Sequence, residues 1–454
     1  MSKPKVSPTE LEQPFAFNDL FFSTTDVRGV ITSGNATFAR VADYSLTDLI
    51  GDPHNIVRHP DMPRAVFQLL WRYLEQGKTI AAFVKNMARN GNYYWVMALA
   101  IPIPEGYLSI RFKPAGSLFN AAQSIYAQIR EFERELELNG VPRKDIASKS
   151  LPRMVQALQA AGFPDYDSFM SSALAQALEE CERGRSPRGD SGHPISSSHD
   201  LARYISEGEQ VGTVLNQVFS NLGSFSGLES ALAEKSQYIH ALALTIQRLS
   251  LNTVVQARRL QHSGETLGVV AEELGRGSRL SQTTINELVQ GMGQLAGSAK
   301  NANFDISVAK LLLDMLLEFS RECLSQSEST TATGSQLEQN NITILRALFS
   351  VFGGRMSQTL SSVIEGVTVV DHKIDQLRKH LTTLRCVQFS GRVEAQRVPQ
   401  AAVFAGAFAE IFRQIEGAYT QLSEFERSIK LVQASKALYV TVNTSVSKLT
   451  QAAI

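Results

Sequence analysis

The sequence predicts an α+β domain followed by a long all-α region. Strand-like segments are confined to the first 114 of the 454 residues, as are both tryptophans, Trp71 and Trp95. Beyond residue 200, apolar residues recur about every 3.5 positions, the spacing of a coiled coil or helical bundle. A stretch rich in Gly, Ser and Pro (184–198) precedes that region and is typical of a linker.

Five strands and three short helices are expected between residues 16 and 114. The strands are predicted at 21–26, 30–32, 79–86, 93–102 and 107–113. The helices are predicted at 35–44, 46–50 and 64–76, the last opened by Pro63 and ended by Gly77. Asn90-Gly91 tolerates positive φ and marks a hairpin turn between the third and fourth strands. The expected result is a five-stranded antiparallel sheet with helices on one face.

The rest of the chain is expected to be helical. Residues 115–183 are predicted to form a helical connector and 184–198 a linker. Two long hairpins are predicted at 199–323 and 337–452, with turns near 260 and 398. One predicted seam steps alternately by four and three residues: Val363, Val367, Val370, Ile374, Leu377, Leu381 and Leu384. A weak repeat at an offset of 138 residues relates the two hairpins, so one chain could build a four-helix bundle, with a homodimer as the alternative.

Composition excludes several functional classes. The chain has 44 Lys+Arg and 44 Asp+Glu, and this balance argues against a general nucleic-acid binder or a polybasic membrane binder. Cys181, Cys323 and Cys386 are far apart and have no disulfide or CxxC spacing, which favours a reducing cytosol. No signal-peptide core and no run of about 18–20 apolar residues is present, so we expect a cytoplasmic protein without membrane insertion.

No catalytic motif was found. The sequence lacks GxxxxGK[ST], HExxH and GxSxG, as well as the motifs of histidine kinases. His54 and His59 have no Cys or acidic set near them that would complete a metal site. We therefore expect no enzyme activity and no metal, and an output made by protein contact.

Five specific motifs lie between Phe22 and Arg111: STTDVRGVI (23–31), PHNIVRHPDMP (53–63), VKN (84–86), YWV (94–96) and LSIR (108–111). Through them this segment resembles the PAS domain of bacterial aerotaxis receptors. The resemblance implies that residues 16–114 are a PAS sensor domain. It also implies that the domain binds FAD and reports redox state, and hence oxygen availability, to the chemotaxis machinery.

Seven residues match flavin-pocket positions or belong to the same loop: Arg58, His59, Asp61, Trp71, Asn86, His54 and Asn55. An aromatic wall suits a flavin ring, and arginine suits the anionic parts of the cofactor. The chain departs from the family at Ile80 and Met87, which leaves heme as a less favoured alternative. An empty pocket or a small metabolite is also left open.

Leu249–Leu274 resembles the kinase-control tip of methyl-accepting chemotaxis proteins. The resemblance implies contact with a chemotaxis histidine kinase and its coupling protein, or with chemoreceptor arrays. The residues expected at this contact are Leu244, Asn252, Gln256 and Arg259. The function expected is that of a soluble cytoplasmic transducer of redox or oxygen signals in energy taxis. A cofactor-free PAS scaffold is the alternative.

Overall fold

The computed structural model describes the chain apart from 1–5, 186–198, 224–239, 242, 246, 249, 256, 260–264, 327–331, 398–401, 435 and 452–454. Its contacts divide into two compact units. The first unit contains Met1–Asn216, Asn303–Arg355 and Thr444–Ile454, and the second contains Gln217–Ala302 and Met356–Asn443.

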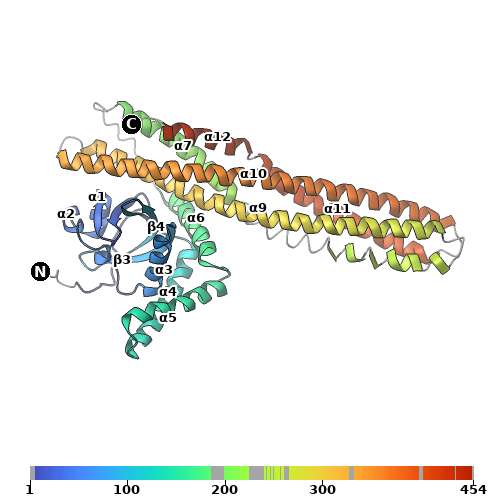
Figure 1. Ribbon diagram of the computed structural model, residues 1–454, viewed down its shortest axis with the longest axis horizontal. Helices are drawn as coiled ribbons and strands as arrows, with labels where there is room; N and C mark the ends of the chain where they lie inside the picture. Colours follow the sequence, from blue (N-terminus) through green and yellow to red (C-terminus); the bar gives the residue numbers. More distant parts are fainter. Residues whose placement is uncertain are drawn as a thin grey trace. The chain divides into compact units, whose positions relative to one another are not determined.

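An antiparallel sheet of five strands forms the centre of the N-terminal domain (Figure 1). The strands are β1 (Phe21–Asp26), β2 (Ile31–Gly34), β3 (Ile80–Met87), β4 (Tyr93–Ile103) and β5 (Gly106–Phe112). Their order is β2-β1-β5-β4-β3, so the first and last parts of the domain meet where β1 pairs with β5. The predicted sheet, followed by long helices, is confirmed.

Tight turns fix the register of the sheet. Gly106, at the turn between β4 and β5, has a φ of 155°, and a Cβ there would lie 1.9 Å from the carbonyl oxygen of Thr25. Only glycine allows β1 and β5 to approach this closely. The second strand begins one residue later than predicted, because the N–H of Val30 donates to the Asp26 carboxylate within the preceding turn.

Short helices cover the inner face of the sheet. They are α1 (Ala36–Ala42), α2 (Leu46–Leu49), a 3-10 turn (His54–Val57) and α3 (Arg64–Glu75). Asn35 and Ser45 begin α1 and α2 as side-chain caps. Pro63 precedes α3 without a side-chain cap of its own.

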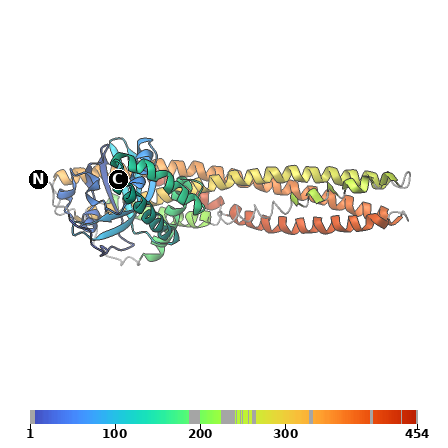
Figure 2. The ribbon, with the colours of Figure 1, turned by 90° about the horizontal axis from the view of Figure 1, so that it is seen from below.

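Three connector helices follow: α4 (Ser117–Leu138), α5 (Arg143–Ala160) and α6 (Tyr166–Gly184) (Figure 2). The ring centroids of Phe119 of α4 and Phe83 of β3 lie 5.3 Å apart on the outer face of the sheet. Tyr166 of α6 donates a hydrogen bond of 2.9 Å to the carbonyl of Ala81. The carboxylate of Glu133, on α4, accepts from the N–H groups of Arg64 and Ala65 at 2.8 and 3.0 Å. The connector therefore supplies the cap that the start of α3 lacks.

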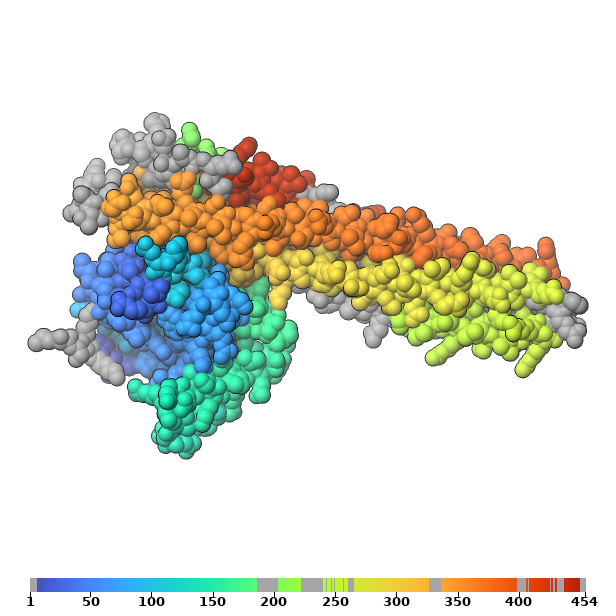
Figure 3. Space-filling model, viewed as in Figure 1, coloured from blue at the N-terminus to red at the C-terminus, as the bar shows by residue number. Residues whose placement is uncertain are grey.

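The first unit also contains parts of the long helices α7 (His199–Gly223), α9 (Glu265–Gln326), α10 (Ala332–Arg397) and α12 (Lys436–Gln451). The start of α10 lies against the N-terminal domain (Figure 3), where Ser33 of β2 donates a 2.8 Å hydrogen bond to Asn341. Phe22 of β1 meets Phe319 of α9 edge to face at 5.0 Å. The outer face of β1 and β2 is thus covered by helices from the far end of the sequence.

The second unit contains only helices among its described residues, including α11 (Ala402–Ala434). The predicted seam of α10 from Val363 to Leu384 is buried at each of its apolar positions. Gly366 and Gly277 allow close packing, because a Cβ at these positions would lie 3.1 and 2.8 Å from Leu295 and Leu384. The turns predicted near 260 and 398 fall outside the described residues.

Candidate functional site

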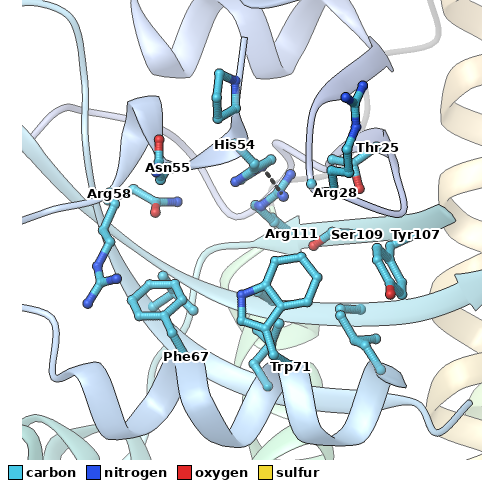
Figure 4. Close-up of a pocket in the computed structure, with 18 residues that line it drawn as sticks. Thr25, Arg28, His54, Asn55, Arg58, Phe67, Trp71, Tyr107, Ser109 and Arg111 are labelled. Carbon is cyan, nitrogen blue, oxygen red and sulfur yellow. Dashed lines mark hydrogen bonds between the residues drawn. The ribbon is translucent and has the colours of Figure 1, made fainter. Parts of the chain in front are cut away.

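A cavity of about 250 Å³ lies between the inner face of the sheet, helix α3 and the loop before α3 (Figure 4). The cavity has room above the sheet because β4 lines it only with the small side chains of Ala98 and Ala100. Val84 and Asn86 of β3 lie beside them. Side chains two apart on a strand point to the same face, so these four residues line one surface.

Helix α3 forms the apolar wall of this cavity. Phe67, Leu70, Trp71 and Leu74 follow the i, i+3, i+4, i+7 pattern of one helix face. Trp71 packs edge to face against Tyr107 of β5 at 5.5 Å. The wall is therefore aromatic and broad, which suits a flat apolar ring.

Arg111 is the buried cation of the cavity. It lies on β5, two residues from Ser109, and its side chain is among the lining residues. Its guanidinium is 3.1 Å from the Ser23 hydroxyl and 2.6 Å from His54 Nε2 (Figure 4). A guanidinium can only donate, so His54 Nε2 is the acceptor and the ring proton resides on Nδ1.

Burial sets the charge states of this pair. Burial, and then the neighbouring Arg111 cation, lower the pKa of His54 well below its ordinary value of 6.5, so the imidazole is neutral at pH 7. Burial also lowers the pKa of Arg111 to about 10, so the guanidinium stays charged at pH 7. Among the described residues no carboxylate forms an ion pair with Arg111.

Arg58 lies at the other end of the cavity. Its guanidinium stacks 3.9 Å above the ring of Phe67 and donates to the Met62 carbonyl at 3.3 Å. Burial, with a further contribution from Arg64, lowers its pKa to about 10. Three arginines and no acidic residue line the cavity, counting Arg28 as the third. This electrostatic pattern favours a ligand with electron-rich or anionic atoms.

The structure brings together five of the seven residues predicted for the flavin site. These are His54, Asn55, Arg58, Trp71 and Asn86. His59 and Asp61 do not line this cavity. Arg58 bridges to Asn86 at the edge of β3, and the next residue, His59, packs edge to face on Tyr93 at 6.5 Å. Asp61 pairs with Lys85 at 3.1 Å and with Arg134.

Sequence reasoning did not select Arg111, Ser109, Tyr107 or Phe67 as site residues. The first three alternate along β5, and this period of two was visible in the sequence. The available signal was Arg111 itself, a charged residue among apolar neighbours at the C-terminal end of β5.

The predicted partner contacts lie on described helical residues of the second unit, except Gln256, which is outside the described residues. Leu244, Asn252 and Arg259 are exposed there. Two exposed apolar residues, Leu251 and Val255, lie on the same stretch of helix.

Neither a metal cluster nor a membrane-spanning helix occurs in the described part of the chain. No group of three or more His, Cys, Asp or Glu is placed to bind a metal there. No helix in those ranges combines the length and apolarity that crossing a membrane requires.

Residues 31–108 match the family described as the PAS fold. The chain is 41% identical over 123 residues to the aerotaxis receptor of Escherichia coli (strain K12), covering 26% of this chain and 24% of the receptor. It is 33% identical over 88 residues to the nitrogen fixation regulatory protein of Klebsiella pneumoniae, covering 19% of this chain and 18% of that protein. This chain thus spans about a quarter or less of the length of these relatives.

Solved structures of a PAS domain and of a LOV protein are also similar to part of this chain, at low identity. A PAS domain from Colwellia psychrerythraea is 20% identical, with a TM-score of 0.19, and covers 21% of this chain and 85% of that chain. The Rhodobacter sphaeroides LOV protein is 15% identical, with a TM-score of 0.21, and covers 37% and 90%. The family match over residues 31–108 shows that the chain contains a PAS domain, and the two curated relatives are named as a receptor and a regulatory protein.

Proposed function

We propose that this chain is a flavin-binding redox sensor that signals through contacts of its long helices. The observation that carries the proposal is the cavity with an aromatic wall and three arginines but no acidic lining residue. The resemblance to aerotaxis receptors supports FAD as the ligand. A bound flavin would supply a redox couple whose reduced form is richer in negative charge.

The residues of the cavity suit such a ligand. Trp71 and Phe67 contribute aromatic surface against which a ring could pack, and Asn86 offers an amide for polar atoms at its edge. Arg111 holds a fixed positive charge beside the cavity, and such a charge favours the electron-rich state of a neighbouring group. Arg111 and His54 would thus both bind the ligand and tune its potential.

A short chain of contacts leads from the cavity to helix α9. Arg111 donates to Ser23 on β1, and the next residue toward the N-terminus, Phe22, packs on Phe319. The carboxylate of Glu322 accepts from the Ala36 N–H at 2.7 Å and from the Asn35 side chain at 3.3 Å. A change in the charge of the ligand beside Arg111 would bias the position of β1, and through these contacts that of α9.

We propose that the output is read by a chemotaxis histidine kinase and its coupling protein. The support is the resemblance of 249–274 to a chemoreceptor tip, with Asn252 and Arg259 exposed on that stretch. All three cysteines are free thiols, and we propose that the protein acts in the reducing cytosol.

The test is a visible absorption spectrum of the freshly purified full chain before and after dithionite. Flavin bands that bleach on reduction would support the proposal. A heme spectrum would keep a sensor but reject the flavin. A colourless chain that does not bind added FAD would reject the redox function and favour a scaffold whose PAS domain binds no cofactor.

A further inference from the structure

We propose that a second cavity, next to the ring cavity, binds the diphosphate of a flavin dinucleotide and is completed by Arg130 and Arg143 of the connector helices. This inference rests on the proposed flavin function. The second cavity has a volume of about 480 Å³ and is lined by residues of the loop before α3, of α3 itself, of α4 and of α5. Arg130 and Arg143 lie outside the PAS domain.

Continuity between the cavities favours one ligand that occupies both. Asn55 and Arg58 line both of them. The first cavity is apolar with room for a ring system, and the second is lined mainly by polar and charged side chains. A ligand with an aromatic ring at one end and a charged tail at the other matches this division.

The charges of the second cavity favour an anion. Four arginines line it, Arg58, Arg64, Arg130 and Arg143, and no lining residue is acidic. Glu137, nearby, pairs with Arg64 and Arg130 at 3.4 and 3.3 Å. Among the described residues, Arg58 and Arg143 form no ion pair.

Glu133 approaches Arg130 at 3.8 Å, but its carboxylate is already used elsewhere. It accepts hydrogen bonds from two backbone N–H groups at the start of α3 and from the Ser150 hydroxyl at 2.7 Å. The cavity and its surroundings thus contain four guanidinium groups and only two carboxylates, a net charge of two positive units. The remaining positive charge matches the two negative charges of a diphosphate diester.

His59 provides a second and independent observation. Its side chain is 3% exposed and lines this cavity. Its Nδ1 accepts a hydrogen bond from the Asp61 N–H at 3.1 Å, so in the neutral ring the proton resides on Nε2. That Nε2–H is buried and has no hydrogen-bond partner among the described residues. A buried donor without an acceptor is unfavourable, and a phosphate oxygen would satisfy it.

The experiment compares three flavins on the full chain, freed of any bound flavin. Riboflavin, FMN and FAD share one ring system; riboflavin carries no phosphate, FMN carries one phosphate, and FAD carries a diphosphate that ends in adenosine. We expect FAD to bind at least tenfold more tightly than riboflavin, and this preference to shrink at high salt because screening weakens exposed charge interactions. Dissociation constants are measured by flavin fluorescence.

Two variants test the role of the connector. Arg143 is exposed, so Arg143→Gln and Arg143→Glu are expected to fold, which circular dichroism checks. We expect Arg143→Gln to weaken FAD about tenfold, Arg143→Glu to weaken it further, and both to leave riboflavin unchanged. Lys144→Gln, its exposed neighbour outside the cavity, removes the same charge and should leave all three affinities unchanged.

The outcomes distinguish the two proposals. Riboflavin and FAD binding equally well, or an FAD affinity insensitive to both Arg143 variants, would overturn the diphosphate site and leave the flavin sensor standing. Failure of all three flavins to bind the unaltered chain would overturn both.

Discussion

Replacing Arg111 by methionine separates two effects of its buried charge: its cost to folding stability and its contribution to flavin binding. Arg111 is 3% exposed, and burial lowers its pKa from 12.5 to about 10. At about 1.4 kcal/mol per pKa unit, this shift corresponds to a cost of about 3 kcal/mol for keeping the guanidinium charged in the fold.

The same side chain stabilises the fold through two polar partners. It lies 3.1 Å from the Ser23 hydroxyl and 2.6 Å from His54 Nε2. Two such hydrogen bonds contribute about 1–3 kcal/mol together. The two effects nearly cancel, and methionine fills much of the same volume. We therefore expect Arg111→Met to change the free energy of unfolding of the flavin-free chain by less than about 2 kcal/mol.

Flavin binding should respond quite differently. Loss of the fixed positive charge should weaken FAD at least tenfold and move the midpoint potential of any retained flavin to a more negative value. Denaturant unfolding, FAD titration and potentiometry measure the three quantities. Arg72→Met, at an exposed position on α3 outside the ring cavity, is the control. A loss of more than about 4 kcal/mol would show that Arg111 is a structural ion, and an unchanged affinity and potential would show that it does not face the ligand.

Four further outcomes follow from the structure. Trp71→Ala should lower FAD affinity at least tenfold, and an unchanged flavin content after purification would contradict its place in the wall. Glu322→Ala removes the acceptor of the Ala36 N–H, so hydrogen exchange at that amide should speed up about tenfold, equivalent to a cap of about 1.4 kcal/mol; unchanged protection would show that α9 does not cap α1. Gly106→Ala should destabilise the domain by more than about 2 kcal/mol, because φ and space both exclude a Cβ, and a melting temperature equal to that of the parent would contradict the tight approach. Because the pKa of His54 is lowered in the fold, the unfolded chain binds the extra proton below pH 6.5. The free energy of unfolding should then fall by up to about 1.4 kcal/mol per pH unit below that value, and the slope should lessen in His54→Gln; equal slopes would show that His54 is not held neutral.

The sheet was predictable because its signals are local. The Asn90-Gly91 turn and the alternation of apolar residues identify strands without reference to the rest of the chain. The predicted boundaries of α3 were likewise close to the observed ones, because Pro63 and Gly77 limit this helix at its two ends.

The cavity was predictable only in part. Arg58 and His59 are adjacent in a segment that runs along the sheet edge, yet Arg58 lines both cavities whereas His59 lines only the second. No spacing rule in the sequence separates their roles. Arg111 was not selected because a period of two identifies a face of the strand but does not reveal that Ala98 and Ala100 leave that face hollow.

Contacts between the PAS domain and helices α9 and α10 lay beyond sequence reasoning. The Ala36 and Glu322 groups are separated by 286 residues, and Ser33 and Asn341 by 308. Heptad periodicity indicates which residues of a helix are buried but not which part of the chain buries them.

The distance in sequence between Ala36 and Glu322 has a consequence for biosynthesis. At about 5–20 residues per second, a ribosome needs roughly 15–60 s to make the 286 residues that separate the start of α1 from its distant cap. During that interval the nascent PAS domain has its own strands and α3, while Phe22 still lacks Phe319 as a neighbour. The proposed flavin could therefore enter the PAS domain before α9 docks, and its supply during translation would influence which chains assemble in the loaded form.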